Sequence, residues 1–543
     1  MMPQTHLHRL RRTFACGALC LAWWLAGVGV QVGWADDLRE SVSPPGETRA
    51  GVPSHAAETA RRLSALEAQL DRVTAENQRL ARELEELQPR SALSQAAVTQ
   101  TALPESAAPQ LPPDPGEGES VWPAEGAPSL PASAGWWPDG ADRSLFSSEG
   151  WHTGYDHGFV IVPAPGNDSP FALKITNQAM FRYSGFLAEE ESWVNSAGIS
   201  NPIDSASNFQ IPRGRLSFAG GALVPSLGYQ LTLDYNTVSS DPIGFRAYIL
   251  SYEFSEALVV HVGQNKVPGS REWLTSAFQV QGPDRSLATT FFRPSLSQGV
   301  WFTGTGFERV HYHLMVSNGF NTSNTAAREL NLSPCYSGSV WWEPWGAFGK
   351  DASDLQWHDQ PAIRLGTSQT FAADRGSQSS SGAPENSLLR LSDGTVITDA
   401  GALAPGVTLT DYTVLLSAFD VGYKYRGLSL LGELYLQTLG NLRGTGPLPL
   451  SSTHALGGYL QGGVFVLPRE FELYGRGSVV AGDYGTGGEY AGGWNWFPIA
   501  GRDSLRVTTD LAYILRSPAD QNRTNYVAGA TGWLLRAQIS TSF

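Results

Sequence analysis

The stretch GWLLRAQISTSF, residues 532–543, ends the chain and alternates with the period of a β-strand. One parity is mostly apolar and ends in an aromatic side chain: Trp533, Leu535, Ala537, Ile539, Thr541 and Phe543. The other parity is mostly polar: Leu534, Arg536, Gln538, Ser540 and Ser542. Successive side chains of a strand point to opposite faces, so this strand has an apolar and a polar face. Both the edge of a soluble β-sandwich and the closing strand of a membrane barrel would look like this.

Four more stretches alternate in the same way: FALKITNQAMFRYSG (171–185), YQLTLDYNT (229–237), FERVHYHLMVSNG (307–319) and SLRVTTDLAYILR (504–516). Several are as long as the ~9–11 residues that a transmembrane β-strand needs, with aromatic residues near their ends and ionisable groups mostly on the polar parity. A strand-rich chain in lipid must close into a barrel, because every backbone polar group has to be paired. Phe543 would then be the last lipid-facing residue of the closing strand.

Composition supports a large all-β domain. Charged residues make up only 16% of the 543-residue chain, glycine is abundant, and there are four lysines, Lys174, Lys266, Lys350 and Lys424. The region from 157 to 543, 387 residues, at ~20–25 residues per strand and connection, predicts roughly 16 strands. We therefore expect an antiparallel transmembrane barrel wide enough for a water-filled lumen.

The N-terminus reads as an export signal. A basic start, MMPQTHLHRLRR, precedes an apolar run and the small residues around Gly33-Trp34-Ala35, which predicts a signal peptide over residues 1–35. An uncleaved membrane anchor is the alternative reading. Cys16 and Cys20 would leave with the signal, so Cys335 would have no intrachain disulfide partner.

Residues 56–88 predict a short α-helical coiled coil. Leucines and related residues follow a heptad spacing of 3,4,3,4: Leu63, Leu66, Leu70, Val73, Asn77, Leu80, Leu84 and Leu87. We interpret the coil as an oligomerisation element, and a single amphipathic helix is the alternative. Residues 89–150 are rich in Pro, Ala, Ser and Gly and predict a disordered linker.

Net charge places most of the acidity outside the barrel. The whole chain has a net charge of −14. Residues 1–35 hold three arginines and no acids, a net charge of +3, and residues 36–157 hold nine basic and twenty acidic residues, a net charge of −11. The remaining residues, 158–543, therefore have a net charge of −6. No part of the chain is basic enough to indicate nucleic-acid binding.

Seven blocks, taken in order, resemble the phosphate-selective porin O and P family of outer-membrane channels. They are HGFVIVPAPGNDSPFALKITNQAMFRYSGF, NFQIPRGRLSFAGGAL, VGQNKVPGSREWLTS followed by Asp284-Arg285-Ser286, LSLLGELYLQ, GGYLQGGVFVLPREFELYGRGSVV, EYAGGWNWFPIAGRDSLRVTTDLAYIL and AQISTSF. The resemblance spans about 157–543. It implies a 16-stranded, usually trimeric barrel in the bacterial outer membrane that passes phosphate or other small anions through a basic constriction. The coiled coil is an addition to the best-known members and would lie in the periplasm.

Basic residues are the candidates for lining such a channel, because charged rings set pore selectivity. By parity we expect Lys174, Arg182, Arg213, Arg215, Arg309, Arg506 and Arg516 to face inward, and Lys266 and Arg285 lie in matching motif blocks. With so few lysines, arginine would have to replace lysine as the phosphate ligand. Phe543, Thr541 and Ile539 would form the C-terminal signal read by the barrel-assembly machinery.

The sequence offers little for catalysis or cofactors. His311 and His313 share one strand face but have no third ligand at a suitable spacing, so we expect no metal site. The glycine-rich stretch GDYGTGGEYAGG (482–493) lacks a strand-to-helix context and reads as a hairpin loop. There is no GxSxG or HExxH motif, although an outer-membrane lipase built from scattered residues stays open.

The main interpretation is an outer-membrane porin for passive diffusion of small hydrophilic solutes, without enzymatic activity or cofactor, and with a preference for anions such as phosphate left open. Its partners would be outer-membrane lipid and two further copies of the chain. The alternatives are a structural barrel that tethers the outer membrane through its periplasmic coil, and a secreted β-rich binding protein. The polar stretch 372–411 predicts an external loop, and whether it folds into the lumen is left open.

Overall fold

The computed structural model describes residues 147–148, 150–164, 167–238, 243–320, 322, 333–375, 388–520 and 525–543. The predicted signal peptide, the predicted coiled coil and nearly all of the predicted linker lie outside these residues and stay predictions.

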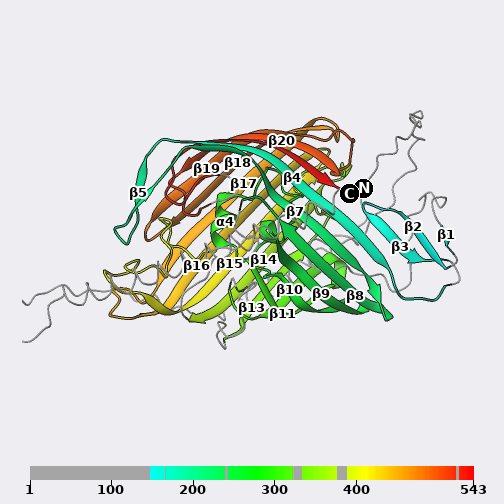
Figure 1. Cartoon of the computed structure of the whole chain (residues 1–543), viewed down its shortest axis with the longest axis horizontal. Helices are drawn as coiled ribbons and strands as arrows, with labels where there is room; N and C mark the ends of the chain where they lie inside the picture. Colours follow the sequence, from blue (N-terminus) through cyan, green and yellow to red (C-terminus); the bar gives the residue numbers. More distant parts are fainter. Residues whose placement is uncertain are drawn as a thin grey trace, which may run out of the picture. The chain divides into compact units, whose positions relative to one another are not determined.

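Sixteen antiparallel strands close into a barrel, in which each strand pairs with the next barrel strand and the last pairs with the first (Figure 1). The strands are β4 (Leu173–Ala188), β7 (Ala206–Ala222), β8 (Val224–Tyr235), β9 (Ile243–Ser255), β10 (Leu258–Lys266), β11 (Leu296–Thr305), β12 (Val310–Ser317), β13 (Cys335–Trp342), β14 (Ala362–Arg375), β15 (Leu409–Tyr425), β16 (Leu428–Gly444), β17 (Thr453–Leu467), β18 (Phe471–Gly482), β19 (Gly485–Trp496), β20 (Leu505–Leu515) and β21 (Gly532–Ser542). The predicted fold class, an all-β barrel of about sixteen strands, is confirmed.

The stretch 532–543 is the closing strand of the barrel. β21 pairs with β4 from Gly532↔Ala188 to Ser542↔Gln178. Phe543 continues the seam by exchanging backbone hydrogen bonds with Asn177, at N···O distances of 2.9 and 2.6 Å. Closure leaves neither strand with an open edge, which in lipid would expose unpaired backbone groups.

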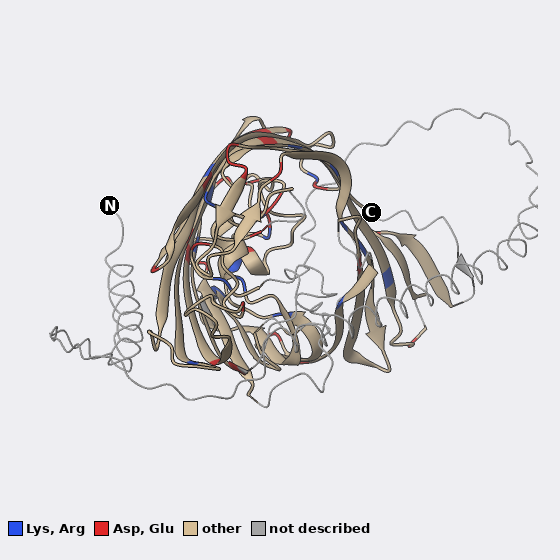
Figure 2. Ribbon diagram, turned by 60° about the vertical axis from the view of Figure 1, so that its left-hand side comes forward, with Lys and Arg blue, Asp and Glu red and all other residues tan. Residues whose placement is uncertain are grey.

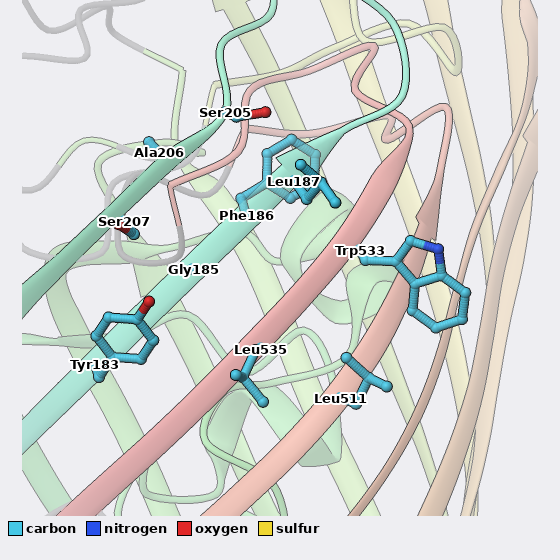
Figure 3. A pocket seen from close by; sticks show the side chains of 10 residues that line it. All are labelled: Tyr183, Gly185, Phe186, Leu187, Ser205, Ala206, Ser207, Leu511, Trp533 and Leu535. Carbon is cyan, nitrogen blue, oxygen red and sulfur yellow. The ribbon is translucent and has the colours of Figure 1, made fainter.

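The outer face of the barrel is apolar, as the alternation predicts. Along β21 the buried and exposed residues alternate, and the exposed ones include Trp533, Leu535 and Ile539. Figure 3 shows Leu187, Leu511, Trp533 and Leu535 lining a shallow groove of about 350 Å³ on the outer wall beside the seam. A wall of this kind suits contact with hydrocarbon and not with bulk water.

The two ends of the barrel differ in their connections. One end, here called the turn end, has short turns such as 426–427 and 468–470, and the 3₁₀ turn η1 (Phe307–Arg309). The opposite end, called the loop end, carries most of the longer connections, among them 189–205, 267–295 and 376–408, whereas 343–361 is a long connection at the turn end. Within 189–205, β5 (Ser192–Val194) and β6 (Ser200–Pro202) form a small hairpin.

Three short strands precede the barrel and extend its sheet. β1 (Ser147–Ser148), β2 (Trp151–Tyr155) and β3 (Phe159–Pro163) pair in order, and β3 pairs with the first residues of β4. In Figure 1 they lie near the C-terminus. The start of the barrel domain that the sequence predicts, at residue 157, therefore falls between β2 and β3.

Two segments differ from their sequence-based interpretation. The glycine-rich stretch 482–493 is mostly strand β19 and not a hairpin loop, because the turn spans only Gly482–Gly485. A Cβ on Gly493 would lie 2.3 Å from the Thr509 carbonyl oxygen, so the close approach of β20 requires glycine there. Similarly, residues 372–375 belong to β14 and residues 409–411 to β15, so the connection between them is shorter than the predicted loop 372–411.

Two helices complete the described part of the chain, α3 (Arg271–Leu274) and α4 (Leu287–Phe292). No helix among the described residues is long and apolar enough to cross a membrane.

Candidate functional site

Residues 267–295, called the inward segment, fold from the loop end into the barrel interior. They carry α3 and α4, and Figure 1 shows α4 enclosed by the strands. Every residue of the segment is buried except Leu274 and Gln279, which are half-buried. A connection this long is usually exposed, so specific contacts with the inner wall must hold it in place.

Asp284 is the centre of these contacts. Its carboxylate accepts hydrogen bonds from Arg182 Nη1 at 2.5 Å and from Arg213 Nη1 at 2.6 Å, and Arg536 Nη1 lies 3.6 Å away. Burial acts to raise the pKa of Asp284, but the three guanidinium charges outweigh it and hold the pKa well below its usual range. The carboxylate is therefore ionised at all physiological pH values and links β4, β7 and β21 to the inward segment.

The same network continues along the wall. Arg536 forms a two-pronged ion pair with Asp510, at 2.8 and 2.5 Å. Arg476 donates to the Asp284 carbonyl oxygen at 2.9 Å and pairs with Glu489 at 2.5 Å. Planar guanidinium groups suit such shared contacts, because each presents five donors in a fixed geometry.

Wall side chains also bind the backbone of the inward segment. Glu433 accepts from the Glu272 backbone N–H at 2.6 Å, and Glu489 accepts from Leu287 N–H at 2.8 Å. Arg506 donates to the Val280 carbonyl oxygen at 2.8 Å. These bonds satisfy backbone groups that would otherwise be buried without partners.

A second connection folds inward from the turn end. Residues 343–361, between β13 and β14, contact the inward segment through a hydrogen bond from Ala352 N–H to the Gln279 carbonyl oxygen at 2.9 Å. Lys424 donates to the carbonyl oxygens of Phe348 and Asp351 at 3.0 and 2.7 Å. Burial, together with the charge of Asp503, raises the pKa of Asp351 to about 6.

The described part of the β14–β15 connection, residues 388–408, reaches across the loop end and is called the mouth strap. Arg390 pairs with Asp520 of the β20–β21 connection at 2.9 Å. Asp393 accepts from Ser196 N–H, in the β4–β7 connection, at 3.0 Å. Ser392 Oγ accepts from Tyr484 N–H at the β18–β19 turn at 3.1 Å. The strap therefore contacts three connections on other sides of the mouth, while residues 376–387 of the predicted loop lie outside the described residues.

Charge inside the barrel differs from that of the chain as a whole. Among the described residues, fourteen basic side chains are buried against nine acidic ones. Figure 2 shows both kinds on the ribbons enclosed by the barrel. The acidic residues neutralise many of the basic ones, yet a positive excess remains in the interior of a chain whose net charge is −14.

Seven of the nine sequence-predicted basic residues lie buried inside: Lys174, Arg182, Arg213, Arg215, Lys266, Arg285 and Arg506. Two of these hold the inward segment itself, since Lys266 and Arg285 both donate to the Thr275 carbonyl oxygen. Arg309 and Arg516 do not lie on the wall: both are exposed in positive-φ positions at strand ends, Arg309 in η1 and Arg516 after β20. Whether the seven line a conducting path stays a prediction.

Several central residues were not identified from sequence. Asp284 was noted only as part of a motif, and the inward-facing Arg364, Arg476 and Arg536 were not named as candidates. A signal was present for the last of these, because Arg536 lies on the polar parity of the closing strand. For Asp284 no periodic signal exists, since its neighbours form neither a strand nor a long helix.

The two histidines that share a strand face do not belong to a metal cluster among the described residues. No group of three or more His, Cys, Asp or Glu side chains in that part of the chain could hold a metal ion. His311 stacks on Trp341 with ring centroids 5.2 Å apart. His313 is buried on the neighbouring inward position.

Comparisons with known proteins give structural likeness only. No family model matches the chain, and no curated protein matches it. Solved structures similar to it include an anion-selective porin from Comamonas acidovorans, at 12% identity and a TM-score of 0.43, covering 69% of this chain and 100% of that one. Others are OmpT of Vibrio cholerae (12%, 0.42, covering 69% and 99%) and the outer-membrane channel DcaP of Acinetobacter baumannii (9%, 0.42, covering 69% and 97%). The assignment of the fold rests on the strand pairing of this chain.

The class of protein that these features define is a closed sixteen-stranded transmembrane barrel with a polar, partly filled interior. Membership of the phosphate-selective porin O and P family stays a prediction.

Proposed function

We propose that this protein is an outer-membrane porin that lets small hydrophilic solutes diffuse through the barrel, with a preference for anions. The observation that carries the proposal is the contrast between the two faces of the wall. The outward parity is apolar, whereas the inward parity and the connections folded inside together hold fourteen buried basic and nine buried acidic side chains among the described residues. A barrel with a polar interior and a lipid-compatible exterior is the arrangement of an aqueous channel.

The anion preference follows from the positive excess inside. Fixed charges near a narrow path attract ions of opposite sign, and they act most strongly where water is scarce. The acidic partners of Arg182, Arg213 and Arg476 reduce this excess. We therefore propose a moderate preference for anions in general, with phosphate as the specialised case that the sequence resemblance suggests.

Single-channel recording of the purified protein in a planar bilayer tests the proposal. Under a KCl gradient, we expect a stable conductance whose reversal potential lies on the chloride side, and a reduced current when millimolar phosphate is added. A reversal potential on the potassium side would contradict the anion preference and leave a general porin. Absence of any conductance would contradict the channel itself and favour the tethering alternative.

A further inference from the structure

The mouth strap crosses the loop end from one side of the barrel to the other. It leaves the wall between β14 and β15, the ninth and tenth of the sixteen barrel strands. Its tip, residues 392–395, lies just beyond the pairing of Arg390 with Val396. The tip contacts the β4–β7 and β20–β21 connections, which flank the seam between the first and the last strand. Because that seam lies opposite β14 and β15 in a closed ring of strands, the strap spans the mouth.

The strap tip fits closely against the far side of the mouth. Thr395 Oγ1 accepts a hydrogen bond from Ser196 N–H at 3.0 Å. Gly394 has a φ of +98°, and a Cβ there would lie 2.9 Å from the Cβ of Ala528. The contact therefore requires glycine, which alone adopts this conformation without strain and brings no side chain.

The inner wall that the strap covers is apolar. Buried strap residues Leu389, Leu391 and Ile397 form one cluster with inward side chains of the wall. The wall members include Ile249 on β9, Trp301 on β11, Met315 on β12, Val414 on β15 and Leu439 on β16. Nearer the turn end the same strands carry polar inward residues, such as His313 on β12 and Glu433 on β16. The wall of these strands thus changes from polar to apolar where the strap packs on it.

Strap and wall together form an apolar seal at the loop end. Apolar side chains on the inner wall of a water-filled barrel would face water if nothing covered them, which is unfavourable in proportion to their area. The strap removes that area from water. A passage narrowed by apolar side chains also loses its water, and ions then do not cross it.

The two parts of the strap are held in different ways. Leu389, Leu391 and Ile397 pack on the wall from which the strap leaves, so detaching them exposes apolar area. The tip reaches the far side through hydrogen bonds and a glycine contact, and Ser196, which donates one of these bonds, is exposed. Hydrogen bonds to the protein are exchanged for bonds to water at a small net cost. The tip therefore leaves the far side more readily than the rest of the strap leaves its own wall.

We propose that the mouth strap is a lid, which closes the barrel at the loop end and lets solutes pass when its tip leaves the far side of the mouth. This inference rests on the proposed channel and adds a closed and an open state to it. The closed state is the one that the contacts of the tip define.

A reversible crosslink between the tip and the far side tests the lid in the full chain. Ser196→Cys with Thr395→Cys is bridged by a short bis-methanethiosulfonate reagent, and mass spectrometry confirms the bridge. Ala188→Cys with Ser205→Cys is the matched control, because Ser205 Oγ also accepts from a backbone N–H, that of Ala188, at 3.0 Å at the loop end but without the strap. Cys335, which is buried, is present in both pairs.

Single-channel conductance in a planar bilayer is the readout. We expect the bridge to the tip to lower the mean conductance roughly tenfold or more, and dithiothreitol to restore it. The control bridge should leave the conductance unchanged. An unchanged conductance with the tip bridged, or an equal loss in both pairs, would overturn the lid.

A second variant opens the mouth instead of locking it. Residues 391–395 are replaced by two glycines, which join the paired residues Arg390 and Val396 through a two-residue hairpin turn. We expect the mean conductance to rise about twofold or more, and heat-modifiable migration confirms that the barrel is folded. Conductance that is equal in the bridged, trimmed and unsubstituted proteins would overturn the lid and leave the channel. Absence of conductance in all of them would overturn the channel and the lid together.

Discussion

At the scale of single residues, the interior depends on shared ion pairs. The Asp284 carboxylate forms ion pairs with three arginines from three strands. One of them, Arg536, also forms an ion pair with Asp510. Such charges are costly to remove from water, and only the partner charges and hydrogen bonds offset that cost. Loss of one member is therefore more damaging than the energy of one contact.

Asp284→Asn is predicted to destabilise the barrel. It leaves Arg182 and Arg213 buried without their carboxylate, which by analogy with other buried pairs costs about 3–5 kcal/mol. The measurement is the urea midpoint of unfolding in lipid vesicles, followed by heat-modifiable migration. Asp359→Asn is the control, because Asp359 is exposed in the turn-end connection 343–361. Equal midpoints for Asp284→Asn and the unsubstituted protein would show that the network carries no net stability.

At the scale of elements, connections and not strands decide how open the barrel is. The inward segment enters from the loop end, residues 343–361 enter from the turn end, and the mouth strap lies across the loop end. The inward segment is bound at many points along its length. The strap is held by buried apolar side chains, among them Leu389, Leu391 and Ile397. Polar contacts add to this, including the Arg390–Asp520 pair, whose side chains are 10% and 39% exposed.

Arg390→Glu is predicted to loosen the strap by placing two carboxylates together. An exposed ion pair is worth about 0.2–1 kcal/mol, so we expect at most a several-fold rise in the fraction of time spent at the highest single-channel conductance. Asp520→Lys in the same chain should reverse the effect by restoring an opposite-charge pair.

Arg443→Glu is the charge-matched control at the same end of the barrel, because Arg443 is exposed near the end of β16. If Arg390→Glu and Arg443→Glu changed the conductance alike, surface charge and not the strap would be the cause.

At the scale of the whole molecule, one seam completes the fold. Every strand except β4 and β21 pairs with barrel strands close to it in sequence, whereas these two join residues near 180 and 540. Contacts so distant in sequence are expensive in chain entropy, so the seam should form late in folding.

Phe543→Ala is predicted to weaken closure of the seam. Phe543 is 57% exposed on the outer face and its backbone bonds to Asn177. Losing the ring removes part of an apolar contact with lipid, roughly 1–2 kcal/mol, while the backbone bonds remain. We expect a smaller heat-modifiable fraction after folding into vesicles, with Thr541→Ser as the control. An unchanged folded fraction would show that the terminal ring does not assist closure.

The sequence by itself determined the wall of this protein. A strand repeats every two residues, so alternation in 171–185, 504–516 and 532–543 was enough to predict strands, faces and the inward position of Arg182 and Arg506. The sequence alone did not predict the structure correctly where the two-residue period of a strand was hidden by glycines or was absent. The glycines of 482–493 resembled a turn. Arg309 and Arg516 were given the parity of strands to which they do not belong, since β12 begins after Arg309 and β20 ends before Arg516.

Only the tertiary structure decided what fills the barrel. Residues 267–295 have no long period, and their place inside depends on partners that the chain supplies from β4 to β21. Asp284 meets Arg536 only after the sixteen strands have closed. Parity is a local property that one strand can display, whereas an ion pair between distant strands exists only in the closed barrel.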